Sequence, residues 1–264
     1  MKIGVFDSGL GGLVITKSFI DSLPEYDYLY YGDSAHLPYG DKTSGRILGY
    51  TLEAMRYMIS RGCKIIIIAC NTATSICLRY IQQRFIPEFA PDVKVLGVVI
   101  PTVEVAVENL SRTVGVVATN ATVRSHIYRT ELLKLNPQLR IVEIAAPELV
   151  PAIECNDFAA ARDFVCKYAE QFTECDSLIL GCTHYPLLKN FFREALPKVR
   201  IVSQDELMAN KLKDYLRRHQ EIETLLSRNG EREFSVSLLN KHSQQVALRL
   251  FPDIHLTKAL LQRE

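Results

Sequence analysis

The sequence predicts an α/β fold built from two similar parallel-sheet domains, and three observations support this prediction. Apolar runs of strand length alternate with stretches of helical spacing, as in strand–helix–strand units. The apolar runs are continuous and rich in β-branched residues, which is typical of strands covered on both faces. A faint internal repeat divides the chain into two halves. We therefore expect domains related by a pseudo-twofold axis, with the active site in the cleft between them.

The first half shows this alternation element by element. Its expected elements, in chain order, are a strand at residues 2–6, a glycine-rich turn at 7–12, a helix at 13–23, a strand at 28–31, a loop at 32–40, a helix at 47–61 and a strand at 64–69. Pro24 ends the first helix, because proline lacks the N–H that a helix interior needs. Asn71 and Thr72 follow the last strand, and we expect them to cap the next helix.

The internal repeat rests on two matches at nearly equal offsets along the chain. Residues 3–8 resemble residues 114–119, because each run forms a strand with glycine in second place and a hydroxyl residue last. Residues 63–70 resemble residues 175–182, since each run begins with one cysteine and ends with another. Buried parallel strands often look alike, but the paired cysteines favour duplication.

The repeat places the halves at residues 1–95 and 96–205. The second half is expected to open with a helix at residues 101–110. From about residue 206 the chain is mostly helical and charged, with a strand expected at residues 233–238. Basic side chains in this last segment are interleaved with acidic ones, which indicates a solvated helix face.

Composition and charge exclude several classes of protein. The chain has 264 residues and a net charge of +1, which gives no support to nucleic-acid or anionic-membrane binding. The longest strongly apolar run, residues 65–69, is far too short to cross a bilayer. Asp7 interrupts the N-terminus where an export signal needs apolar residues. We therefore expect a cytoplasmic protein with no membrane segment.

The seven cysteines fit a reducing compartment, because they are too few for a disulfide scaffold and show no C-x-x-C spacing. We expect no metal, since only Cys182 has a nearby histidine, His184, at a spacing poor for zinc. Five cysteines are interpreted as small buried apolar residues: Cys63, Cys77, Cys155, Cys166 and Cys175.

Cys70 and Cys182 are the candidate catalytic residues. Each ends a predicted buried strand, so both are expected at the carboxyl edge of a parallel sheet, where α/β folds bind ligands. Each is also expected to face the N-terminus of a helix, whose dipole lowers the pKa of a thiol. If the halves face each other, the two thiols lie on opposite sides of one ligand.

Two opposed thiols suit inversion at a carbon stereocentre. One thiolate removes a proton while the other thiol donates one, and no cofactor is needed if the site stabilises the negative charge that develops on the substrate. A redox disulfide is the alternative use of paired cysteines. Asp7 and His184 each add an ionisable group to one half, where it could orient a thiol, accept its proton or hold a substrate ammonium.

Polar residues at the predicted strand ends indicate a pocket for a small zwitterion. The turn at residues 8–12 offers free backbone amides for a carboxylate but matches no nucleotide-binding fingerprint. The polar strand-end residues are Ser8, Asn71, Thr72, Thr119 and Thr183.

The combined motifs resemble the glutamate racemases, within the cofactor-independent aspartate/glutamate racemase superfamily. The matching text lies at residues 3–12, 31–34 with 38–40, 69–73, 147–154 and 180–187, in the family's order. The resemblance implies that Cys182 with His184 acts on L-glutamate and that Cys70 with Asp7 acts on D-glutamate. It also implies that Glu154 assists His184.

The resemblance further implies a set of substrate contacts. These are Asp7, Ser8, Tyr39, Gly40, Asn71, Thr72, Thr119, Thr183 and His184. It implies a homodimer that needs neither pyridoxal phosphate nor metal and that supplies D-glutamate for bacterial peptidoglycan. It also implies that residues 206–264 return to pack on residues 1–95.

Three segments depart from the family pattern. Residues 202–204 read Val-Ser-Gln where the family usually has Asp-Ser-Gly, residues 235–239 lack the usual small residues, and Ala118 stands where glycine is common. Two other hypotheses stay open: a broad-specificity or aspartate racemase, and a binding or regulatory protein on a racemase scaffold.

Overall fold

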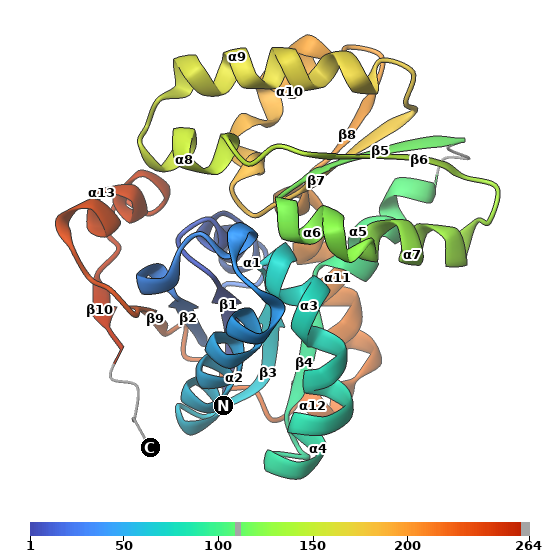
Figure 1. The fold of residues 1–264 in the computed structure, drawn as a ribbon. Helices are drawn as coiled ribbons and strands as arrows, with labels where there is room; N and C mark the ends of the chain where they lie inside the picture. Colours follow the sequence, from blue (N-terminus) through green and yellow to red (C-terminus); the bar gives the residue numbers. More distant parts are fainter. Residues whose placement is uncertain (109–111, 260–264) are drawn as a thin grey trace.

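Two parallel β-sheets form the framework of the protein. A computed structural model describes residues 1–108 and 112–259 of the chain. The first sheet has six strands in the order β10-β9-β2-β1-β3-β4, and the second has four in the order β6-β5-β7-β8. All strand pairs in both sheets are parallel. Figure 1 shows the second sheet and its helices forming a separate layer above the first.

The first half follows the expected alternation closely. Its strands and helices are β1 Lys2–Asp7, α1 Gly12–Ser22, β2 Tyr28–Gly32, α2 Ser44–Ser60, β3 Cys63–Ile68, α3 Asn71–Tyr80, α4 Ile86–Phe89 and β4 Lys94–Gly97. The loop between β2 and α2 contains two short 3-10 turns, Ser34–His36 and Tyr39–Asp41, and a π-helical turn joins α3 to α4. Each expected strand and helix of this half is present within three residues of its predicted bounds.

The second half repeats the pattern, and a final segment returns to the first sheet. The elements of the second half are α5 Val99–Val107, β5 Thr113–Ala118, α6 Asn120–Ser125, α7 Ile127–Leu135, β6 Arg140–Ala145, α8 Leu149–Glu154, α9 Phe158–Ala169, β7 Ser177–Gly181, α10 Lys189–Ala195 and β8 Arg200–Val202. The final segment holds α11 Gln204–Arg218, α12 Gln220–Glu223, β9 Arg232–Val236, α13 Lys241–Leu250 and β10 Leu256–Lys258.

The strand order confirms the predicted internal repeat. In the first sheet β1 lies between β2 and β3, and β4 follows β3. In the second sheet β5 lies between β6 and β7, and β8 follows β7. The two sequence matches therefore fall on equivalent strands, β1 with β5 and β3 with β7. The final segment adds β9 and β10 to the first sheet alone, beside β2.

A shared hydrophobic core joins the halves. Helices α1 and α11 cover one face of the first sheet, α5 and α7 cover the facing side of the second, and buried residues of all four helices belong to one cluster. A second cluster lies between the first sheet and helices α2 and α3. A third lies under α8, α9 and α10. The carboxyl ends of the central strands of both sheets lie where the two halves meet.

Several predicted details differ from the structure. The helix expected at residues 101–110 begins two residues earlier, at Val99, and is described to Val107; residues 109–111 lie outside the described part. Cys155 and Cys166 are exposed rather than buried, because they lie on the solvent side of the helical layer above the second sheet. The predicted domain boundaries fall inside β4 and α11, and the domain division itself stays a prediction. Among the described residues, no helix is long and apolar enough to cross a membrane.

Candidate active site

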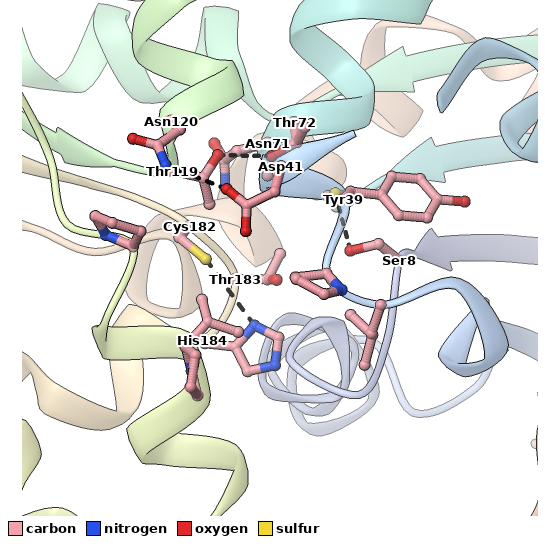
Figure 2. A pocket seen from close by; sticks show the side chains of 17 residues that line it. Ser8, Tyr39, Asp41, Asn71, Thr72, Thr119, Asn120, Cys182, Thr183 and His184 are labelled. Carbon is pink, nitrogen blue, oxygen red and sulfur yellow. Dashed lines mark hydrogen bonds between the residues drawn. The ribbon is translucent and has the colours of Figure 1, made fainter. Parts of the chain in front are cut away.

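The predicted site residues meet in one small pocket between the halves. Its cavity measures about 50 Å³ and lies at the carboxyl ends of β1, β3, β5 and β7. Ten predicted residues line it: Ser8, Tyr39, Gly40, Cys70, Asn71, Thr72, Thr119, Cys182, Thr183 and His184. Figure 2 shows Ser8 and Tyr39 on one side of this pocket and Cys182 with His184 on the other. Asp7 and Glu154 do not line the cavity but lie behind it.

Cys70 is held at the junction between β3 and α3. It is only 4% exposed, its thiol lies 3.3 Å from Ser8 Oγ, and its sulfur accepts a hydrogen bond from the Ala73 amide at 3.4 Å. Cys70 is therefore itself the N-cap of α3, in place of the expected Asn71 and Thr72.

The pKa of the Cys70 thiol runs opposite to the prediction. Burial raises it to about 12, and the nearby Asp7 acts in the same direction. The hydrogen bonds that Cys70 forms with Ser8 and with the Ala73 amide lower this pKa but do not offset the burial. Cys70 is therefore a protonated thiol at neutral pH.

Cys182 is followed by a relay of side chains. The distance from Cys182 Sγ to His184 Nδ1 is 3.9 Å, and His184 Nε2 lies 2.6 Å from Glu154 Oε1. Burial lowers the pKa of His184, but Cys182 and Glu154 outweigh this effect and hold the pKa well above its ordinary value. A charged imidazole is thereby held beside the sulfur of Cys182.

The element after Cys182 differs from the prediction. A short 3-10 turn, Tyr185–Leu188, follows the thiol, and the α-helix starts only at Lys189. Cys182 therefore gains little from a helix dipole, since the effect falls off within the first turn. The group beside the thiol is instead His184, which contacts Glu154.

Asp7 is the acidic residue behind the Cys70 side of the pocket. It is fully buried, and its Oδ2 accepts hydrogen bonds from the amides of Gly9 and Gly12 at 3.1 Å each. Its Oδ1 has no hydrogen-bond partner among the residues that the structure describes. Burial raises the pKa of Asp7, while His184 and the two amides oppose this shift.

Three threonine hydroxyls form a cluster that joins the halves. Thr72 Oγ1 lies 2.9 Å from Thr119 Oγ1 and 3.2 Å from Thr122 Oγ1, and the last two atoms are 3.0 Å apart. Thr72 is the second residue of α3 in the first half, whereas Thr119 caps α6 in the second. Thr122 was not predicted; the helical spacing of three residues from Thr119 was the signal available.

Tyr39 and Gly40 contribute their backbone and shape to the wall. The Tyr39 hydroxyl donates to Asp33 Oδ2 at 2.7 Å and points away from the pocket (Figure 2). A Cβ at Gly40 would lie 3.0 Å from Thr119 Cβ, so glycine permits the close approach of the halves there. Neither residue presents an ionisable group to the cavity.

Sequence reasoning missed the remaining lining residues. These residues are Leu37, Pro38, Asp41, Asn120, Pro147, Val150 and Pro151. At the pocket mouth, Asn120 Nδ2 donates to Asp41 Oδ1 at 3.1 Å and so bridges the halves. No three His, Cys, Asp or Glu side chains of the described chain are placed to hold a metal ion.

The geometry provides acid–base groups on two sides of one small pocket. A family model described as Asp/Glu/Hydantoin racemase matches residues 19–211 of the chain. The chain belongs to the Asp/Glu/hydantoin racemase family. Membership confirms the resemblance that the motifs indicate and the expected enzyme class, an amino-acid racemase.

Curated relatives of this racemase are named glutamate racemase. The protein of Ruegeria pomeroyi is 38% identical over 235 residues, which cover 83% of this chain and 86% of the relative. The protein of Lactobacillus acidophilus is 36% identical over 207 residues, which cover 77% of this chain and 75% of the relative. The roles of individual site residues stay predictions.

Solved structures of glutamate racemases share the whole fold of this racemase. The Bacillus anthracis isoform has a TM-score of 0.88 at 29% identity, and the match covers 98% of this chain and 97% of that one. The Francisella tularensis enzyme in complex with D-glutamate has a TM-score of 0.87 at 31% identity, with the same coverage. These matches confirm the predicted fold class.

Proposed function

We propose that this chain is a cofactor-independent glutamate racemase that interconverts L- and D-glutamate. The observation that carries the proposal is the position of Cys70 and Cys182, at equivalent strand ends of two halves and on the wall of one pocket. Glutamate as the substrate is supported by the relatives' names and by the relative whose structure holds D-glutamate.

The thiols act as a base and an acid in turn. For L-glutamate, the Cys182 thiolate takes the α-proton, the Cα–H electron pair moves toward the carboxylate, and the Cys70 thiol returns a proton to the opposite face of Cα. For D-glutamate the two cysteines exchange roles. The buried, protonated state of Cys70 suits the acid role in the first direction.

The other predicted residues support these two thiols. His184, held in the charged form by Glu154, stabilises the Cys182 thiolate. Asp7 lies behind the glycine turn on the Cys70 side, where it favours proton transfer to and from D-glutamate. The hydroxyls of Ser8, Thr72 and Thr119 line the pocket and offer donors to the substrate carboxylates, because each hydroxyl can turn its proton toward an anion.

Proton exchange in heavy water tests the proposal directly. The purified protein is incubated with L-glutamate in deuterium oxide without added cofactor, the α-proton is followed by NMR and the optical rotation by circular dichroism. We expect both signals to disappear together. Retention of both signals in a folded, reduced sample would contradict the proposal, and aspartate would then be tested in the same assay.

Matched cysteine variants separate a catalytic thiol from a structural one. Cys70→Ser and Cys182→Ser should each abolish racemisation in both directions, because every turnover uses both thiols. Cys77→Ser is the control, since Cys77 is also buried on α3 but does not line the pocket. Full activity of Cys70→Ser would sink the two-thiol assignment.

The biological setting follows from the same proposal. We place the enzyme in the cytoplasm as a homodimer that supplies D-glutamate for peptidoglycan. The free state of all seven cysteines supports a reducing compartment. The mass of the native protein in solution, measured by light scattering, tests the homodimer. A comparison of kcat/KM for glutamate and aspartate tests the substrate. A preference for aspartate would overturn the assignment of glutamate as the substrate.

A further inference from the structure

Gln204 occupies the point where the chain leaves the second sheet and returns to the first. It follows β8 by two residues, begins α11 and is fully buried. It is also the last residue of the Val-Ser-Gln segment that departs from the family pattern. A buried amide at a crossing between two halves needs hydrogen-bond partners, and those partners show what it does.

The Gln204 amide forms a reciprocal pair with the amide of Asn71. Asn71 Nδ2 donates to Gln204 Oε1 at 2.9 Å, and Gln204 Nε2 donates to Asn71 Oδ1 at 2.9 Å. Tyr128 of α7 donates its hydroxyl proton to the same Asn71 Oδ1 at 2.6 Å. Gln204 Nε2 also lies 3.2 Å from Thr102 Oγ1 on α5.

The donors and acceptors of this network fix the orientation of both amides. Thr102 Oγ1 donates to the Val98 carbonyl at 2.6 Å, so its lone pairs remain to accept from Gln204 Nε2. Gln204 must therefore turn its nitrogen toward Thr102 and its oxygen toward Asn71 Nδ2. Asn71 in turn keeps its oxygen toward Tyr128 and Gln204, which leaves its second Nδ2 hydrogen without a hydrogen bond to another described residue.

Asn71 connects this network to the active site. It is the residue after Cys70 and the first residue of α3, and it lines the pocket. We propose that Gln204 is a positioning residue, which acts through Asn71 to fix the start of α3, and with it Cys70 and Thr72, against the second half. This inference rests on the proposed racemase function and deepens it on the Cys70 side.

The geometry explains why one side chain can have this effect. The amide pair ties α3, which belongs to the first sheet, to α5 and α7, which cover the second. Proton transfer between a thiol and Cα is sensitive to the position of the thiol, because a displacement of about 1 Å can cost about a hundredfold in rate. The relative position of Cys70 and Cys182 depends on the same contact between the halves.

Gln204→Met removes the amide and keeps the length of the side chain. We expect kcat to fall about tenfold or more in both directions, with KM changed much less, at a temperature where the variant is fully folded. Gln244→Met is the matched control, because Gln244 on α13 also has both ends of its amide hydrogen-bonded, although it is only partly buried and does not line the pocket. A wild-type kcat in folded Gln204→Met would overturn the inference.

Gln204→Glu provides a second test that does not depend on the methionine variant folding. A neutral glutamic acid can accept from Asn71 Nδ2 and donate to Asn71 Oδ1, whereas the ionised form loses the donor. The ratio of variant to wild-type kcat should therefore fall as pH rises, in a single ionisation step. Tyr128, the phenol in contact with this amide, stays neutral over this range because burial holds its pKa above its ordinary value. A ratio that is constant with pH would overturn the inference.

The two proposals fail in different ways. If wild-type protein does not racemise glutamate, the proposed function is wrong, and the Gln204 variants are then compared by the rate at which iodoacetamide alkylates Cys70 in the folded protein, measured by mass spectrometry. If the wild type is active and both Gln204 variants match it at every pH, only the positioning role is wrong. An unchanged alkylation rate of Cys70 in Gln204→Met would likewise contradict the positioning role.

Discussion

Asp7 is a buried carboxylate whose ionisation works against folding. Burial raises its pKa in the folded protein above the ordinary value. The folded state is therefore favoured while Asp7 is protonated, and that stability is lost as pH rises through the folded pKa. We predict that Asp7→Asn melts at a higher temperature than the wild type at about pH 8, and that the difference narrows as pH falls toward about pH 4. Thermal unfolding followed by circular dichroism measures both effects.

Asp27 is the matched control, because its shift has the opposite sign. Burial would raise the pKa of Asp27, but hydrogen bonds from Ser227, Glu231 and Asn229 outweigh burial and lower this pKa to about 2. Its ionised form stabilises the fold above the ordinary pKa of about 3.8, and this stability is lost as pH falls toward 2. Asp27→Asn should therefore melt at a lower temperature at neutral pH. If Asp7→Asn is also less stable than the wild type at every pH, burial is not the dominant influence on the pKa of Asp7.

The positions of Cys70 and Cys182 could be predicted from the sequence, but the protonation of Cys70 could not. A cysteine that ends an apolar strand is placed at a sheet edge by the strand itself. The pKa of Cys70 depends on burial by residues that come from both halves. The sequence close to Cys70 therefore does not predict this pKa. The pKa of His184 likewise depends on Glu154, which lies thirty residues earlier.

At the scale of elements, the start of α1 packs directly against His184 and Thr183. An added Cβ at Gly11 would lie 2.6 Å from His184 Nδ1 and 2.8 Å from Thr183 Oγ1. The backbone of Gly11 is right-handed helical, with φ −59° and ψ −35°, so alanine fits the backbone and only this contact opposes it. We predict that Gly11→Ala lowers kcat about tenfold or more, because His184 must move relative to Cys182. Steady-state kinetics in both directions measure the loss.

Gly45 is the control for that substitution. It lies in α2, and an added Cβ would meet nothing within 4 Å. Gly45→Ala should leave kcat unchanged and stabilise the protein by about 0.5–1 kcal/mol, because alanine favours the helix. A wild-type kcat in Gly11→Ala would show that the approach of α1 to His184 does not position the histidine.

The predicted elements were accurate where periodicity alone decides them. Strands β1, β2 and β3 and the helices between them lie close to their predicted bounds, because each buries a continuous apolar face. The errors fall at helix starts, where the local rule concerns hydroxyl and amide caps. Cys70 caps α3 with its sulfur, and a 3-10 turn follows Cys182. Both cysteines line the pocket, and neither is followed by the helix start that the capping rule predicts.

At the scale of the whole molecule, the two halves share one core and one site. The repeat was visible in the sequence because equivalent strands β1 with β5 and β3 with β7 keep similar text. The contacts between the halves were not visible, because Gln204 meets Asn71 and Thr119 meets Thr72 only after the chain has folded. Sequence alone therefore predicted the two halves and the positions of their thiols, but not the contacts that hold the halves in position against each other.

Because residues of both halves line the pocket, substrate binding should stabilise elements of both halves. We predict that D-glutamate slows amide hydrogen exchange in peptides covering the start of α3 and the 3-10 turn at residues 39–41 in the first half, and α6 in the second. The helix α9 serves as the internal control, since it lies outside the pocket. Glutarate, which lacks the amino group, tests specificity. Protection confined to one half would mean that this half binds the amino acid alone and that the opposed thiols do not enclose it.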